Sequence, residues 1–378
     1  MRVLITSDIF PPEVGWSATY VPVIARALVQ RGHQVRVLVR GRGTPGGTDD
    51  EGYPFEMERM DVTQPRWRRM LQTGFRLFAH LRWADVVYVN GLLAETGFAN
   101  RFLRKPAVAR VTGDTVWELA GETGWTDAEF GPSGRGRLGR EIEQRRLPPR
   151  RALRHMRVIV VSSASLQRIV SSWGIKPSRI QVVPNAFVEA PARAGSWPEC
   201  LATPHRLITV GRLTTWQGID DLLVAIVPFD DVGLLVVGEG PQRSSLESLA
   251  RRLQLEQRVY FAGEMEREAL IGAMRSSDLF VLNSRYEGLP SVMIEALAVG
   301  LPVVAAAAGG VYELITDGVN GRLVPVGDRA ALRDAIRAAL DDPITRGAWH
   351  DAGLAILRRF PLKVMVGRMV EILEGTSS

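Results

Sequence analysis

The sequence predicts an α/β protein with two domains, each built on a doubly wound parallel sheet. At 378 residues the chain is longer than a single hydrophobic core usually supports, so two domains are expected. Short apolar runs alternate with helix-like segments through the first half, and a second alternation starts near Leu207. A stretch rich in proline and small residues, Val182–Trp197, separates the two series. We therefore expect an N-terminal domain at 1–185, a C-terminal domain at 186–361 and a helix at 362–378 that could return to the N-terminal domain.

Each expected strand is a short apolar run, and most are followed by a helix-like segment. The first series opens with a strand at Val3–Thr6, a helix over about Ser17–Arg31 and a strand at Gln34–Val39. Gly32 lies where a glycine commonly ends a helix. The remaining expected strands are at residues 86–89, 108–111, 158–161, 207–210, 233–237, 259–261, 279–282, 302–306 and 322–324. This alternation is typical of parallel strands that helices cover on both faces.

Composition and charge exclude several classes of protein. The apolar fraction of 46% marks a globular chain, and the single cysteine, Cys200, leaves no intramolecular disulfide, as in a reducing compartment. The first ten residues are typical of a strand rather than of a signal peptide, so we expect a cytoplasmic protein. Residues 1–190 carry 28 Lys and Arg against 18 Asp and Glu, and the rest carry 19 against 23. The two halves should therefore face different partners.

Three strand-to-helix loops contain residues suited to a phosphate. In the loop Phe10–Tyr20, Gly15 could let an anion approach the main chain and a helix N-terminus, although a glycine there often serves backbone geometry alone. The loop lacks the spaced glycines of a dinucleotide site, which disfavours a nicotinamide-dependent oxidoreductase. In the second half, Arg212 follows an expected strand and could clamp a diphosphate, with a surface salt bridge as the alternative. Gly238 ends another strand at the same expected edge.

The stretch Asn283–Glu295 contains two glutamates that could hold sugar hydroxyls. Glu287 should lie in the loop after a buried strand, and Glu295 inside the helix that begins near Pro290. A carboxylate can accept hydrogen bonds from two neighbouring hydroxyls, and ligands of open parallel sheets bind at this edge. Solvated surface glutamates are the alternative, and the spacing alone does not decide between them.

The segment Ser284–Asp328 strongly resembles the retaining family-4 glycosyltransferases of GT-B fold, the glycosyl transferases of group 1. The resemblance extends over nearly the whole chain through FPPEVG, RGHQVRVL, VVPNAF, GRLTTWQGID and VGEGP. It implies two Rossmann-like domains that face a central cleft, with the nucleotide-sugar site in the C-terminal domain. By the same resemblance, Glu287 contacts the donor sugar and Glu295 holds the ribose. Gly15 and Arg212 face the diphosphate.

Further positions are expected to line the two substrate sites. Glu287 and Arg212 are the expected catalytic residues. The expected donor-binding residues are Gly15, Gln217, Gly238, Gly263, Met265, Gly288, Leu289 and Glu295. The residues expected on the acceptor side are Trp16, Thr112, Asp114, Trp117 and Glu118. A helix N-cap at Asp114 and a core position for Trp117 are the structural alternatives.

Three positions depart from the family pattern. Gln217 stands where a lysine usually assists Arg212. Trp16 replaces the second glycine of the first loop, and Thr112 stands where many members have a histidine. Losing one charge-assisted hydrogen bond costs about 1.5–3 kcal/mol, which a working site can survive. The departures could slow transfer, alter donor choice or mark an inactive paralogue.

The expected reaction is transfer of a glycosyl group from a nucleoside diphosphate sugar to an acceptor hydroxyl, with retention and with no cofactor or metal. The sequence has no Asp-x-Asp motif and no His/Cys cluster at metal-ligand spacing. One alternative is a sugar-nucleotide epimerase of similar fold. Another is a non-catalytic partner that binds a nucleotide sugar.

The stretch Arg66–Arg82 predicts a basic amphipathic helix. The apolar residues on its expected face are Trp67, Met70, Leu71, Phe75, Phe78 and Leu81. Such a helix could lie on an anionic membrane, and packing on its own sheet is the alternative. A second arginine-rich stretch, Gly134–Arg157, has no aromatic ladder or zinc-finger spacing, which disfavours nucleic acid. If the helix lies on a membrane, we expect a glycan or lipid-linked acceptor and a cytoplasmic protein that is peripheral to the inner face of the cell membrane.

Overall fold

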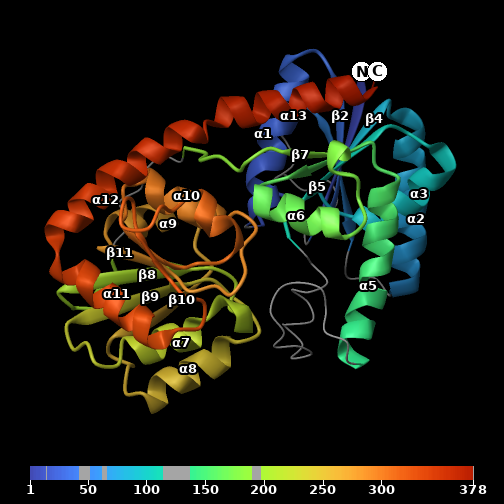
Figure 1. The fold of residues 1–378 in the computed structure, drawn as a ribbon. Coiled ribbons are helices and arrows are strands. Elements are labelled where there is room, and N and C mark those ends of the chain that lie inside the picture. The colour runs from blue at the N-terminus through green and yellow to red at the C-terminus, as the bar shows by residue number, and fades with distance from the viewer. Residues whose placement is uncertain (14, 42–51, 62–65, 114–136, 190–196, 378) are drawn as a thin grey trace. The chain divides into compact units, whose positions relative to one another are not determined.

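The computed structural model describes residues 1–13, 15–41, 52–61, 66–113, 137–189 and 197–377. The chain divides into two α/β units, each built around one parallel sheet (Figure 1). The N-terminal unit comprises residues 1–112, 141–184 and 362–378, and the C-terminal unit comprises 113–140 and 185–361. The prediction of two doubly wound parallel sheets is therefore confirmed.

The sheet of the N-terminal unit has seven parallel strands in the order β3-β2-β1-β4-β5-β6-β7. β1 is an interior strand, with Val3 paired to Val35 on one side and to Val86 on the other. The chain builds outward from β1 to β3 and then returns to β4, so the strand order reverses between β1 and β4. The strands are β1 Arg2–Ser7, β2 Gln34–Gly41, β3 Glu56–Asp61, β4 Val86–Val89, β5 Ala107–Val111, β6 Val158–Val161 and β7 Ile180–Val182.

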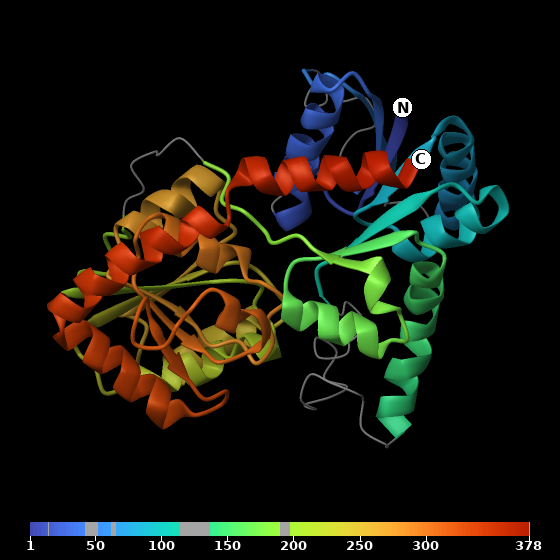
Figure 2. The same cartoon turned by 45° about the horizontal axis from the view of Figure 1, so that its top comes forward.

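Helices cover both faces of this sheet. They are α1 Trp16–Gln30, α2 Arg66–Trp83, α3 Leu93–Leu103, α5 Arg137–Arg154, α6 Ala164–Ser172, the 3-10 helix η2 Pro177–Arg179 and α13 Leu362–Ser377. The last helix packs on α1, β4 and β5, far from its neighbours in sequence (Figure 2). Its Glu374 accepts hydrogen bonds from Arg31 at 3.2 Å and from His33 at 2.9 Å, which join the C-terminus to the loop before β2.

The C-terminal unit has a six-stranded parallel sheet in the order β10-β9-β8-β11-β12-β13. Its strands are β8 His205–Val210, β9 Val232–Val237, β10 Val259–Gly263, β11 Leu279–Leu282, β12 Val303–Ala306 and β13 Arg322–Val324. Its helices are α7 Ile219–Ala225, α8 Arg243–Arg252, α9 Arg267–Arg275, α10 Ser291–Ala298, α11 Arg329–Asp341 and α12 Pro343–Ile356, with short 3-10 helices η3 Thr215–Gln217, η4 Gly309–Glu313 and η5 Leu357–Arg359. Two apolar cores, one on each face, bury the strands.

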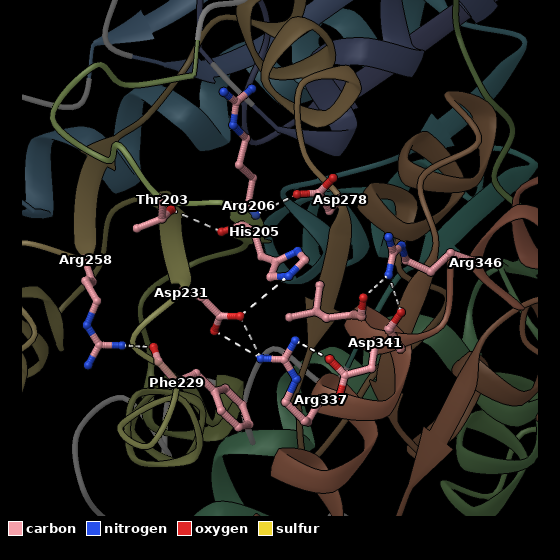
Figure 3. A network of polar contacts seen from close by, with 12 residues as sticks. Thr203, His205, Arg206, Phe229, Asp231, Arg258, Asp278, Arg337, Asp341 and Arg346 are labelled. Atoms are coloured by element: carbon pink, nitrogen blue, oxygen red, sulfur yellow. Dashed lines mark hydrogen bonds and ion pairs between the residues drawn. The ribbon is translucent and has the colours of Figure 1, made fainter. Parts of the chain in front are cut away.

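A polar network fixes α11 to the amino edge of this sheet, opposite the edge where ligands of such folds bind (Figure 3). Arg337 Nη1 donates to both carboxylate oxygens of Asp231 at 3.0 Å, and His205 Nε2 lies 3.6 Å from Asp231 Oδ2. Arg337 also pairs with Asp341 at 2.5 Å. Partial burial acts to raise the pKa of Asp231, but the hydrogen bonds and charge of Arg337 outweigh it and lower that pKa.

Replacing Arg337 by methionine should lower the free energy of unfolding by about 1 kcal/mol at pH 7, because the half-exposed Asp231 loses its charge-assisted partner. An aspartate with a lowered pKa stabilises the fold above its ordinary pKa, and that contribution is lost as pH falls through the lowered value. Denaturant unfolding at neutral and acid pH measures the difference. Arg333→Met, on the same helix and paired only with its neighbour Asp334 in the contacts described for it, is the control. Equal losses in the two variants at pH 7 would contradict the assignment.

Candidate functional site

Apart from Gly15, which lies in the N-terminal unit, the expected donor-site residues gather at the carboxyl edge of the C-terminal sheet. Arg212 follows β8, Gly238 follows β9 and Gly263 ends β10. Glu287 lies in the loop after β11, and Gly309 begins the 3-10 helix after β12. Because all these strands are parallel, their carboxyl ends meet at one edge, where open α/β sheets bind ligands.

The loop between β11 and α10 is held by hydrogen bonds from two other parts of the chain. Asn283 Nδ2 donates to the Gly218 carbonyl at 2.9 Å, and the Arg285 amide donates to the Trp216 carbonyl at 2.7 Å. These two bonds tie the loop to the segment after β8. Asn185, which lies between β7 and β8, donates through Nδ2 to the Leu289 carbonyl at 3.1 Å and to the Ser291 hydroxyl at 2.8 Å. Residues of the motifs VVPNAF and GRLTTWQGID thus support the loop that contains Glu287.

The glycine pair after β12 lets a second loop lie directly against Glu287. The Gly310 amide donates to the Glu287 carbonyl at 3.0 Å. A Cβ on Gly309, whose φ is +52°, would lie 2.1 Å from that carbonyl oxygen, and a Cβ on Gly310 would lie 1.9 Å from the Gly288 oxygen. No larger residue fits at either position without displacing the loop. The backbone of Glu287 and Gly288 is therefore fixed on both sides.

Glu287 is partly exposed and contacts two neutral side chains. Desolvation raises the pKa of Glu287 to about 7, and the polar side chains of Ser284 and Gln217 offset only part of that rise. Ser284 Oγ donates to Gln217 Oε1 at 2.9 Å, which leaves the Gln217 amide nitrogen as the donor toward Glu287. The residue that replaces the usual lysine is therefore a neutral partner of Glu287. Both protonation states of this carboxyl are accessible near neutral pH.

Glu295 lies on α10 and is paired with Arg267 of α9. Arg267 also donates to the Val188 carbonyl at 2.5 Å, and its guanidinium lies 5.7 Å from the centre of the Phe187 ring. Burial raises the pKa of Glu295, and Arg267 opposes that rise. Sequence reasoning missed Arg267, because nothing in the local pattern marks the first residue of α9 as a partner of α10.

The remaining expected donor residues lie on adjacent strands of the same edge. Arg212 is exposed just past β8. The Gly238 amide donates to the Gly263 carbonyl at 2.8 Å, which joins the ends of β9 and β10. A Cβ on Gly238 would lie 2.1 Å from the Gly211 oxygen, so the loops after β8 and β9 touch through their backbones. Met265 follows two residues after Gly263 and is partly buried.

Three described residues of the expected site belong to the N-terminal unit and lie at the carboxyl edge of its own sheet: Gly15, expected on the donor side, and Trp16 and Thr112, expected on the acceptor side. Gly15 is the N-cap residue of α1, and Thr112 is exposed directly after β5. Trp16 begins α1, where its ring lies 4.7 Å from that of Tyr20 and 4.3 Å from the guanidinium carbon of Arg110. The expected residues Asp114, Trp117 and Glu118 lie outside the described part of the chain.

A buried polar network beside Trp16 was not predicted. Arg110, in the apolar run of β5, donates to the Val183 carbonyl at 3.2 Å. Tyr88 of β4 donates to Asn90 Oδ1 at 3.0 Å. Burial raises the pKa of Tyr88 to about 12, although Arg110 favours the phenolate. A charged residue inside an apolar strand was the signal in the sequence that could have identified Arg110.

Two kinds of feature are absent from all the residues that the structure describes. These residues contain no cluster of three or more His, Cys, Asp or Glu side chains that could hold a metal ion. Across the same residues, none of the helices is both long and apolar enough to cross a bilayer.

Two family models match the two halves of the chain. The model described as glycosyl transferases group 1 matches residues 201–354, and the glycosyl transferase 4-like domain matches residues 17–186. The chain is 27% identical to a glycogen synthase of Mycobacterium tuberculosis, over 91% of this chain and 87% of that protein. It is 29% identical to a GDP-mannose-dependent monoacylated alpha-(1-6)-phosphatidylinositol monomannoside mannosyltransferase of Corynebacterium glutamicum, over 99% and 98% of the two chains.

Solved structures share the fold over the whole chain. Anabaena HepE in complex with UDP-glucose has a TM-score of 0.77 at 22% identity, covering 99% of this chain and 100% of that one. A sucrose-phosphate synthase from Thermosynechococcus elongatus has a TM-score of 0.78 at 21% identity, covering 99% and 98%. Both similarities bear out the predicted arrangement of two parallel-sheet units.

Replacing Glu287 by glutamine should stabilise the protein at alkaline pH. The pKa of Glu287 is raised from 4.5 to about 7 in the fold, so its contribution to stability is full below about pH 4.5 and is lost as pH rises through 7. Glutamine mimics the neutral form. We expect the free energy of unfolding to rise by up to about 3 kcal/mol at pH 8 and to change little near pH 4.

Denaturant unfolding at both pH values measures this effect, with the exposed Glu264→Gln as the control. A Glu287→Gln effect that is the same at both pH values would contradict the raised pKa.

Proposed function

The chain belongs to the family-4 glycosyltransferases of GT-B fold, and we propose that it transfers a sugar from a nucleoside diphosphate sugar to an acceptor hydroxyl, with retention at the anomeric carbon. The observation that carries this proposal is the fixed position of Glu287. Its backbone is bonded by the loop after β12, its own loop is tied to the segment after β8, and its carboxyl contacts only neutral groups among its described partners. A carboxyl fixed in this way at the ligand edge of the sheet is suited to hold sugar hydroxyls.

We assign the nucleotide end of the donor to the loops beside Glu287. Arg212 faces the diphosphate, and the backbone groups near Gly238, Gly263 and Met265 face the nucleotide. Glu295 accepts the ribose hydroxyls. Names of similar proteins support this donor class, because HepE was solved with UDP-glucose and the Corynebacterium relative is described as GDP-mannose-dependent.

In the proposed reaction, the acceptor oxygen bonds to the anomeric carbon and its proton is released. The bond from that carbon to the diphosphate breaks, and the nucleoside diphosphate leaves with the bonding electron pair. Negative charge therefore grows on the leaving oxygen, and preorganised donors stabilise it. Arg212 and the backbone amides near it supply these donors without a metal ion. Gly288 and Leu289 hold the sugar end of the donor beside Glu287.

A second candidate function is nucleotide-sugar binding without turnover, as in a non-catalytic partner subunit. The observation that favours it is the orientation of Gln217. Its side chain bonds with Ser284 and Glu287, so it adds no positive charge to the proposed diphosphate site. The two functions differ in turnover and agree in donor binding.

We place the acceptor among cell-surface polysaccharides and glycolipids, and the protein at the inner face of the cell membrane. The acceptor side includes Trp16 and Thr112 of the N-terminal unit and the expected Asp114, Trp117 and Glu118. Two relatives support the acceptor class, since one is named for glycogen synthesis and another for a phosphatidylinositol mannoside. Arg66–Arg82 supplies the proposed membrane contact.

Replacing Glu287 by alanine should abolish transfer and leave donor binding largely intact, because the nucleotide contacts lie on other loops. A thermal-shift panel of UDP-, GDP- and ADP-sugars identifies the donor first, since a ligand at about 100 times its Kd stabilises a protein by about 2.7 kcal/mol. Product formation with that donor then measures transfer. Near-normal transfer by the variant would overturn the role of Glu287, and no stabilisation by any nucleotide sugar would overturn the proposed function.

Replacing Gln217 by lysine should lower the pKa of Glu287 and add a cation beside the proposed diphosphate. We expect the pH profile of transfer to move toward lower pH and kcat to rise by about tenfold, equivalent to about 1.4 kcal/mol. Gln217→Met is the control, because it removes the amide without adding charge. The same pH profile in both variants would contradict a direct contact between residue 217 and Glu287.

A further inference from the structure

Two neighbouring helices of the N-terminal unit expose large apolar side chains. On α2, Leu71, Phe75 and Phe78 recur at the spacing of one helical face and are 68%, 79% and 38% exposed. On α3, Phe98 and Phe102 are 68% and 66% exposed, and their rings meet edge to face with 5.8 Å between centroids. Single exposed apolar residues are ordinary, but such a group on two adjacent helices indicates a contact surface.

The packing of the two helices explains why these side chains point outward. Leu77 and Leu81 of α2 are fully buried in the same core as Ala99 of α3. The two helices also pack against each other, as both ribbon views show (Figures 1 and 2). Their outward faces therefore lie on the same side of the sheet. We call the five exposed residues of these faces the aromatic surface.

This arrangement corrects the expected single apolar face of α2. Leu81 lies on the buried side, whereas Leu71, Phe75 and Phe78 lie on the exposed side. The side chains of residues 66–70 lie outside the described part of the chain. Packing on the sheet and exposure of apolar residues, which were alternatives in the sequence, thus occur together on opposite faces of one helix.

The chain around the aromatic surface is strongly basic. Residues 66–105 contain eight Lys and Arg against two Asp and Glu, a balance of +6. Both acidic residues already pair with arginines outside this segment, Asp85 with Arg2 at 2.7 Å and Glu95 with Arg40 at 2.6 Å. Arg76 is offset by Glu58 of β3, so the surface combines exposed aromatic rings with the positive charge of the other cations in the segment.

We propose that the aromatic surface of α2 and α3 docks onto an anionic phospholipid membrane. The phenylalanine rings enter the interface, and the exposed Arg101 and Arg104 at the end of α3 face the lipid headgroups. A second copy of the chain suits this surface poorly, because a two-fold contact would place two strongly positive surfaces against each other. The inference deepens the proposed function and rests on it only for the lipid-linked acceptor that docking would make accessible.

Vesicle flotation tests the proposal with the full-length protein. We expect flotation with vesicles that contain phosphatidylglycerol, weak flotation with phosphatidylcholine alone, and loss at high salt because the attraction is partly electrostatic. The double variant Phe75→Ser and Phe98→Ser should reduce the partition coefficient by at least roughly tenfold, since two phenylalanine rings no longer enter the interface. Arg101→Glu with Arg104→Glu should reduce it by roughly tenfold or more.

Two matched substitutions on the C-terminal unit control for general effects of the changes. Ile344 of α12 is 85% exposed, so Ile344→Ser removes an equally exposed apolar side chain, and Arg252→Glu reverses an exposed charge on α8. Both controls should float like the wild type. No flotation with anionic vesicles at low salt, or equal losses in the phenylalanine and control variants, would overturn the proposal.

Light scattering and donor binding separate the remaining explanations. A dimer in solution that the Phe75→Ser and Phe98→Ser variant abolishes would identify a second copy as the occupant and overturn membrane docking. Thermal shift by nucleotide sugars should be unchanged in all these variants, because none lies in the proposed donor site. Flotation without donor binding would uphold membrane docking and reject the proposed function. Donor binding without flotation would uphold donor binding and reject membrane docking.

Discussion

The hydrogen bond from the side-chain Nδ2 of Asn283 to the Gly218 carbonyl is the contact on which the carboxyl edge of the C-terminal sheet depends. It joins the loop after β11 to the loop after β8, two segments about 65 residues apart whose strands are neighbours in the sheet. The bond from Arg285 to Trp216 reinforces it. A loop held at both ends loses little further entropy when a ligand binds, so this edge is prepared for recognition before the ligand arrives.

The same tether decides the electrostatics of Glu287. It places Gln217 next to Ser284 and Glu287, so a neutral amide occupies the position that the family resemblance assigns to a cation. Because the described partners of Glu287 include no cation, desolvation raises the pKa of this carboxyl. Glu295 has the opposite arrangement, since Arg267 partly offsets the effect of burial. Glu287 and Glu295 are only eight positions apart, but their different partners give the two carboxyls different electrostatic environments.

The N-terminal unit has positive charge both in its interior and on its surface. Its buried cation, Arg110, lies under Trp16 at the carboxyl edge of the sheet, while Arg101 and Arg104 near the aromatic surface are exposed. α13 covers the other side of the unit, where Glu374 joins it to Arg31 and His33. Positive charge in this unit thus has two environments, one buried near the proposed acceptor side and one available to an anionic partner.

Local sequence determined most of the fold, because apolar runs and glycine positions depend on neighbours along the chain. It missed β3, whose sequence EMERMD has only two apolar residues and no regular alternation, and the three-residue β7, which is too short to show a pattern. The spacing of Glu287 and Glu295 placed one in a loop and the other in a helix. Only the tertiary structure decided their partners, Gln217 and Arg267, and which face of α2 is buried, because contacts between distant segments leave no periodic trace in the sequence.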